Sequence, residues 1–153
     1  MAHTIEALTY IAVTANKSVP LSLLRMTTLL YLSDWRSALQ YEKQISDIQW
    51  MHPFVSKLPE IAQRLSIAHF KLDSQLNVEF VGEPLSHSSL PREEQECIDF
   101  VLRTEGHKGW IESFRLAYST YPMFSQSPQA ILDLVGLAKQ YSDAQHLATH
   151  RVG

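Results

Sequence analysis

The chain has 153 residues, 45% hydrophobic and 19% charged, which is typical of one globular domain. Its net charge of −3 at pH 7 lacks the cationic excess of proteins held by phosphate contacts, so nucleic acid is a disfavoured partner. The single cysteine, Cys97, excludes an intrachain disulfide and favours a cytoplasmic location. Neither a signal peptide nor a membrane span is expected, because the apolar runs are too short.

Apolar residues at three- and four-residue steps predict a series of helices in the first half of the chain. Pro20 is expected to open the second of them, since proline is tolerated in the first turn of a helix. Residues 42–50 break the helical pattern and predict an extended or tightly turned stretch. The expected helices are Thr4 to Thr14, Pro20 to about Ala38 and Pro53 to about Ser66.

Two short segments alternate apolar and polar residues and predict a small β-hairpin at about 69–81, turning at Ser74-Gln75. Further helices are expected over 91–103, over 110–118 and from Pro128 onward, with a loop over 120–126. The fold class predicted is therefore mainly α (α+β), a single compact domain of five to six helices with one hairpin. The domain is expected to span residues 1–145, and 146–153 to form a flexible C-terminal tail.

The motifs of phosphate, dinucleotide, serine-hydrolase and metalloprotease sites are all missing, so an enzyme is not expected. His146 and His150 stand four residues apart, as two metal ligands on a helix do, but no further ligands lie near them in the sequence. We therefore expect no metal and no cofactor. Gly106-His-Lys-Gly109 matches a loop that clamps nucleic-acid backbone in KH domains, but the acidic helix before it favours a helix C-cap and connector.

Asp34 is an acidic residue within a mainly apolar helix face. A buried carboxylate must be hydrogen-bonded or paired, because its desolvation is costly. A structural tether is the favoured interpretation; partner contact and catalysis are the alternatives. No second carboxylate or histidine stands at a fixed spacing from Asp34 to support catalysis.

Two segments outside the predicted helical patterns are rich in the residue types that protein interfaces favour. One is Trp50-Met-His-Pro-Phe54, and the other is Tyr121-Pro-Met-Phe124. These segments are candidates for partner binding if the fold brings them together. It is equally open that they fold back as lids over the core. The candidate partner-binding residues are Trp50, Met51, Phe54, Tyr121, Met123 and Phe124.

Several short motifs agree in order and spacing with one known family. They are Leu29-Leu-Tyr-Leu-Ser-Asp-Trp35, Gln44-Ile-Ser-Asp-Ile-Gln-Trp50, Leu90-Pro-Arg-Glu-Glu94, Tyr118-Ser-Thr-Tyr-Pro122, and Ile131-Leu-Asp-Leu-Val135 with Ala138-Lys-Gln-Tyr141. Over roughly residues 4 to 143 the chain resembles the Panacea domain of SocA-like antitoxins and phage-associated proteins. It departs from the family at Met51-His-Pro53, where members commonly have Tyr-Gly-Pro.

The resemblance implies an antitoxin of a bacterial or prophage toxin–antitoxin system that neutralises a cognate protein toxin by direct binding. It implies no catalytic centre, and it leaves a homodimer open. The alternatives are a phage-associated protein of the same fold that binds a host protein and, less favoured, a nucleic-acid-binding module. The Met51-His-Pro53 departure bears on the class of partner, because it lies in one of the two aromatic segments.

Overall fold

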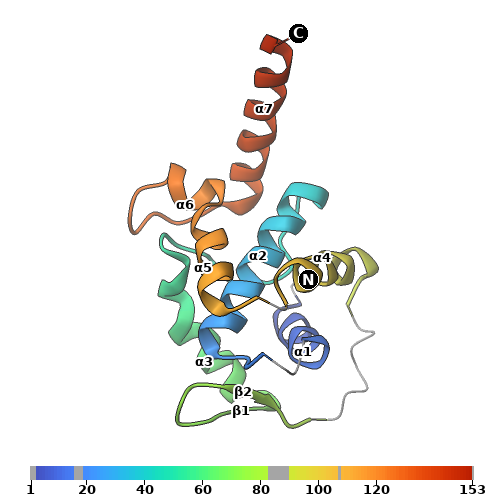
Figure 1. The fold of residues 1–153 in the computed structure, drawn as a ribbon, viewed down its shortest axis with the longest axis vertical. Coiled ribbons are helices and arrows are strands. Elements are labelled where there is room, and N and C mark those ends of the chain that lie inside the picture. The colour runs from blue at the N-terminus through green and yellow to red at the C-terminus, as the bar shows by residue number, and fades with distance from the viewer. Residues whose placement is uncertain (1–2, 16–18, 83–89, 107, 153) are drawn as a thin grey trace.

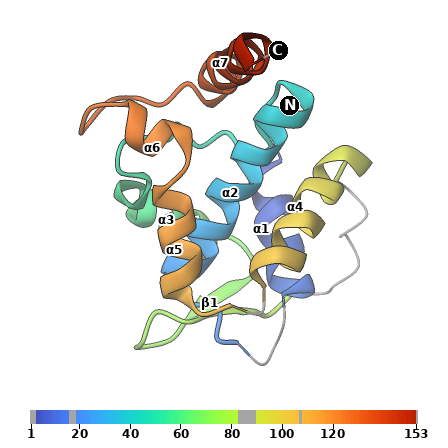
Figure 2. The same ribbon diagram turned by 45° about the horizontal axis from the view of Figure 1, so that its top comes forward.

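Helix α2 lies at the centre of the computed structural model, which describes residues 3–15, 19–82, 90–106 and 108–152 (Figure 1). It contacts α1, α3, α4, α5, α7 and the 3₁₀-helix η1, which surround it (Figure 2). The elements are α1 (Thr4–Thr14), α2 (Leu23–Tyr41), η1 (Phe54–Lys57), α3 (Leu58–Ser66), β1 (Phe70–Leu72), β2 (Val78–Phe80), α4 (Arg92–Glu105), α5 (Trp110–Tyr118), α6 (Tyr121–Ser125) and α7 (Leu134–Val152).

Helix α2 is buried on every side, because an unbroken run from Arg25 to Trp35 is buried. Three of its buried hydroxyl groups are satisfied within the helix. Thr27, Thr28 and Ser33 each donate to the backbone carbonyl four residues earlier, at 2.7–2.8 Å. These three donors are therefore paired in the core, whereas the buried Ser37 hydroxyl of the same helix has no hydrogen-bond partner among the described residues.

Helix α2 begins three residues after the predicted start at Pro20. Its N-cap is Ser22, whose hydroxyl accepts a hydrogen bond from the Arg25 amide at 3.1 Å. A serine cap of this kind satisfies one of the free amides at a helix start. The helix therefore begins after Ser22 and not at Pro20. The other helices of the first half lie close to their predicted ranges.

The predicted hairpin is confirmed as an antiparallel pair in which Phe70 faces Phe80 and Leu72 faces Val78. Its turn depends on Asp73, whose carboxylate accepts hydrogen bonds from the amides of Gln75 and Asn77 at 2.8 and 2.9 Å. This side-chain turn replaces the Asn-Gly pair that tight hairpins commonly use. The mainly α fold with one small hairpin is thus present.

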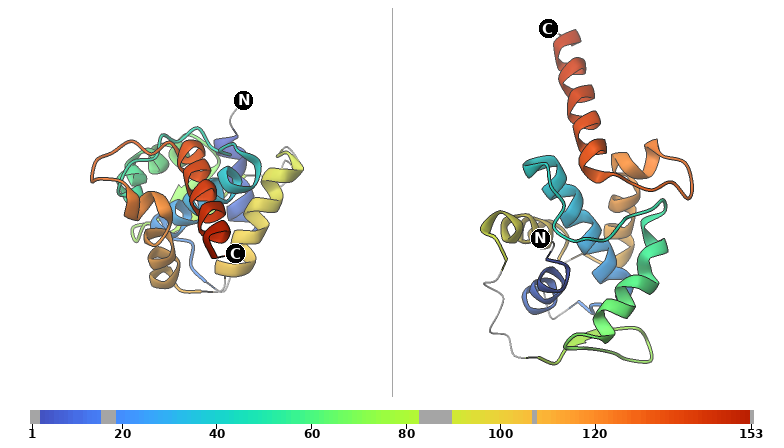
Figure 3. Two further views of the ribbon diagram at one scale, coloured as in Figure 1. Left: turned by 90° about the horizontal axis from the view of Figure 1, so that it is seen from above. Right: turned by 180° about the vertical axis from the view of Figure 1, so that it is seen from behind.

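Two expectations for the C-terminal third differ from the structure. Residues 120–126 are not a plain loop, because Tyr121–Ser125 form the short helix α6. The last helix begins at Leu134, several residues after Pro128, and it continues through Val152, so 146–152 are helical. The described residues contain seven α-helices, where five or six were expected. Beyond its first turns, α7 projects from the body of the protein (Figure 3).

No helix within the described ranges is long and apolar enough to cross a membrane.

Candidate partner-binding surface

Asp34 fixes the irregular segment that connects α2 to η1. It is fully buried, and one carboxylate oxygen accepts hydrogen bonds from the amides of Ile45 and Ser46, both at 3.0 Å. The other oxygen accepts from the Ser46 hydroxyl and from the Trp50 indole N–H, the latter at 2.8 Å. Four donors from a segment without regular structure thus converge on one side chain, which is the geometry of a structural tether.

The pKa of the Asp34 carboxyl is raised to about 6 by burial, because desolvation penalises the charged form. The hydrogen bonds from Ser46, Trp50 and Ile45 oppose this shift. The carboxylate is enclosed by groups that all donate to it, and it has no exposed face. These contacts suit a structural role better than a catalytic one.

Trp50 and Phe54 belong to the core, so their expected role as exposed partner-binding residues is corrected. Both are 0% exposed. The ring of Tyr31 lies 5.3 Å from Trp50 and 4.9 Å from Phe54, stacked on the latter. Met123 is also buried, at 4%. These three residues fold back over the core, which was the alternative interpretation of their segments. Aromatic and apolar groups are stabilised most by leaving water.

The fold does bring the two aromatic segments together. The His52 imidazole Nε2 lies 2.7 Å from the carbonyl oxygen of Met123 and donates to it in the matching tautomer. Backbone hydrogen bonds also join the first segment to the chain that follows α6: His52 N donates to Ala130 O at 2.9 Å and Leu132 N to Trp50 O at 2.8 Å. The two segments, some 70 residues apart, are therefore joined by a side-chain hydrogen bond, and main-chain pairing ties the first of them to the chain after α6.

Of the six candidate residues, Phe124 is the one that is mostly exposed to solvent. Its side chain is 69% exposed, and its ring lies 5.5 Å from that of Tyr121, which is half-buried. Ile131, which pairs with the half-buried Met51 in an isolated bridge, is 60% exposed. A smaller aromatic surface than expected thus remains, on α6 and the segment after it.

A second apolar surface, which sequence reasoning missed, is a groove beside the start of α5. We call it the Trp110 groove. It has a volume of about 480 Å³, and its walls come from the starts of α2, α3 and α5 and from the hairpin turn. Trp110 is 51% exposed and Leu76 is 54% exposed. The groove is lined by Ser22, Leu23, Leu24, Leu58, Pro59, Ala62, Gln75, Leu76 and Trp110.

Leu76 is held in an unusual backbone conformation at the edge of this groove. Its φ is 60°, in the left-handed region that residues other than glycine rarely adopt. Its carbonyl accepts a hydrogen bond from the Leu23 amide at 2.7 Å, and its amide donates to the Asp73 carbonyl at 3.0 Å. The hairpin turn is thus tied to the start of α2, and a large apolar side chain stands half in solvent at a strained position.

Helix α5 runs between the hairpin and α6, and so connects the Trp110 groove with the Phe124 surface (Figures 1 and 2). Two further residues of α5, Ile111 and Leu116, are 47% and 43% exposed. Exposed apolar side chains are therefore present on α5 as well as on its two neighbours, the hairpin turn and α6. A sequence scan misses this surface because Trp110, at a helix start, looks like an ordinary core residue.

The loop that resembles a nucleic-acid clamp has a structural use. Its residue His107 lies outside the described residues. The carbonyls of Glu105, Gly106 and Lys108 all accept hydrogen bonds from the Arg25 guanidinium, at 2.6–3.1 Å. Arg25 is only 2% exposed, and burial lowers its pKa. The loop therefore caps α4 by means of an arginine of α2, as the connector interpretation expects.

The described residues contain no group of three or more His, Cys, Asp or Glu side chains placed to hold a metal ion. The chain matches no family model, and comparison with curated proteins and with solved structures finds no match. The resemblance to the Panacea domain therefore rests on the sequence motifs alone.

Proposed function

We propose that this protein is an antitoxin that neutralises a cognate protein toxin by direct binding, with the Trp110 groove as the centre of the interface. The observation that carries the proposal is the groove itself. It is a largely apolar hollow with a half-exposed tryptophan, next to a strained, half-exposed leucine. The resemblance to antitoxins of the Panacea type supplies the class of partner.

Protein interfaces are commonly dominated by a few buried aromatic anchors, and tryptophan is prominent among them. Trp110 meets this description, since its indole ring contacts Phe114 on one side at 6.2 Å and is otherwise half in solvent. A partner that inserts apolar side chains into the groove would bury the rest of the ring. The exposed residues of α5 and Phe124 would extend the contact toward α6.

The proposal is tested by co-expressing the chain with the adjacent reading frame and scoring growth rescue and co-purification. Trp110→Ala should lose both, while Ile67→Ser should keep both. Ile67 is a matched control, because it is 80% exposed but does not line the groove. A toxic neighbour that is rescued equally well by Trp110→Ala would place the interface elsewhere.

If no toxic frame lies beside the gene, the partner can be sought by crosslinking at position 110. A photoreactive residue there should capture one protein reproducibly, and the same residue at position 67 should not. Capture of nothing at 110 would contradict a protein-binding role for the groove.

A further inference from the structure

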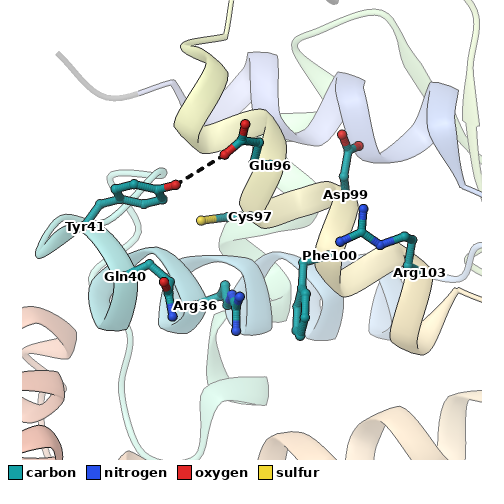
Figure 4. Close-up of a pocket in the computed structure, with 8 residues that line it drawn as sticks. All are labelled: Arg36, Gln40, Tyr41, Glu96, Cys97, Asp99, Phe100 and Arg103. Carbon is teal, nitrogen blue, oxygen red and sulfur yellow. Dashed lines mark hydrogen bonds between the residues drawn. The ribbon is translucent and has the colours of Figure 1, made fainter.

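A second hollow lies on another part of the molecule, between the C-terminal half of α2 and the outer face of α4. Its volume is about 330 Å³, and Figure 4 shows the eight residues that line it. The Phe100 ring stands in its middle. The guanidinium carbon of Arg36 lies 3.7 Å from the ring centre, and that of Arg103 lies 6.0 Å from it. Two cationic groups from different helices thus share one aromatic platform.

The two carboxylates in this hollow are already engaged by other groups. Asp99 accepts a hydrogen bond from the Tyr10 hydroxyl at 2.6 Å. Glu96 accepts from the Tyr41 hydroxyl at 3.3 Å through one oxygen, and its other oxygen lies 3.4 Å from Arg92 Nε. One oxygen of Asp99 and both oxygens of Glu96 therefore have partners other than Arg36 and Arg103.

The two arginines of the hollow have no ionic partner among the described residues. Within the described part of the chain, neither Arg36 nor Arg103 forms an ion pair. Asp99 and Arg103 stand four residues apart on α4, a spacing that usually favours pairing, yet Asp99 binds Tyr10 instead. By contrast, Arg64 on α3 pairs with Asp47 at 2.7 Å. The hollow thus presents two guanidinium groups that are paired with no carboxylate among the described residues.

We propose that this hollow binds a carboxylate group, received by Arg36 and Arg103 at the Phe100 ring. Guanidinium groups recognise carboxylates through paired N–H donors, and both arginines have such donors to offer. A carboxylate carries one negative charge, and Glu96 and Asp99 line the same hollow. The two acids balance the charge of the two arginines, so a phosphate gains little over a carboxylate from its second charge. The ring of Phe100 would support an apolar or planar portion next to the carboxylate.

This inference goes beyond the proposed antitoxin function and does not depend on it, because the hollow is lined by α2 and α4 and shares no residue with the Trp110 groove.

The test uses the ¹⁵N-labelled full chain and follows the Nε–Hε signals of its arginines during titration with sodium benzoate at constant ionic strength. The signals of Arg36 and Arg103 should shift together and saturate. In Arg36→Gln and Arg103→Gln the dissociation constant should rise at least fivefold. In Arg115→Gln it should not change, since Arg115 is an exposed arginine outside the hollow. Each variant must first melt like the unmodified chain.

Three results would overturn the proposal: shifts that do not saturate, equal weakening by Arg115→Gln, or tighter binding of inorganic phosphate than of benzoate in a parallel titration. The third would show that the site selects a more highly charged anion. If Arg36→Gln melts early, Arg36→Lys keeps the charge but loses the paired donors, and it should still weaken benzoate binding.

Discussion

At the scale of single residues, Asp34 is the acceptor for four hydrogen bonds that hold residues 45–50 in place. Asp34→Ala should lower the free energy of unfolding by about 3 kcal/mol or more, since a buried donor left unpaired costs about 1–3 kcal/mol. Chemical denaturation measures this. The matched control is Asp143→Ala, an exposed acidic residue that should change stability by less than about 0.5 kcal/mol. Equal effects of the two variants would rule out the tether.

The raised pKa of Asp34 predicts a pH dependence of stability. Its folded pKa of about 6 lies above the unfolded value near 4, so the folded state binds the proton more tightly. The stability from this group is fully present below about pH 4 and is lost as the pH rises through 6. The free energy of unfolding of the unmodified chain, relative to Asp34→Asn, should therefore fall by about 2 kcal/mol between pH 4 and pH 7. A difference that grows with pH would contradict this.

At the scale of elements, Arg25 of α2 holds the end of α4. Replacement by Met keeps much of the side-chain volume but leaves three carbonyls of the 105–108 segment without their donor. Arg25→Met should lower the free energy of unfolding by about 3 kcal/mol, the cost of breaking a buried charged network. Amide hydrogen exchange should also speed up over residues 105–110. The exposed Arg115→Met should do neither, and a stable Arg25→Met with unchanged exchange would refute the capping role.

The hairpin turn gives a second prediction for an element. Leu76→Asn should relieve about 1 kcal/mol of left-handed backbone strain, since asparagine tolerates that region. It also removes a half-buried leucine worth about 1 kcal/mol. Because the two effects offset each other, the melting temperature should stay within a few degrees. Partner binding should nevertheless weaken about tenfold or more. Loss of stability together with binding would show that Leu76 is structural only.

The limits of sequence-based prediction also appear at this scale. The hairpin and the longer helices were predictable, because residue patterns of period 2 and 3.6 extend over whole segments. Helix α6 was not, since its five residues make little more than one turn and carry no periodic signal. The side chains of Trp50 and Phe54 could not be placed, because their segment is irregular and its burial depends on Asp34 and on contacts with the chain after α6.

The candidate surfaces show the same limit. Phe124 was identified from its residue type and segment, and it is exposed as expected. Trp110 and Leu76 meet only in the folded chain, where the hairpin turn is hydrogen-bonded to the start of α2. Asp34 was predictable as a tether, because an acidic residue in an apolar helix face has few other uses. Its partners at 45, 46 and 50 were not.

At the scale of the whole molecule, the parts divide into a scaffold and a surface. The scaffold is α2 with the elements around it, including the aromatic cluster of Tyr31, Trp50 and Phe54. The surface comprises the hairpin turn, α5 and α6, which carry the exposed apolar residues Leu76, Trp110, Ile111, Leu116 and Phe124. Binding residues placed on a rigid scaffold need little ordering when a partner arrives, which favours affinity. This division is compatible with the proposed protein-neutralising function.

Binding of a protein partner in the Trp110 groove is tested most directly by the dissociation constant of the purified complex. Trp110→Ala should raise it at least about thirtyfold, since an anchor residue is worth 2 kcal/mol or more and about 1.4 kcal/mol is tenfold. Phe124→Ala should raise it less, because that residue lies toward the edge. The variants should melt like the unmodified chain, as both side chains are at least half exposed. A change of less than threefold in folded Trp110→Ala would contradict the account.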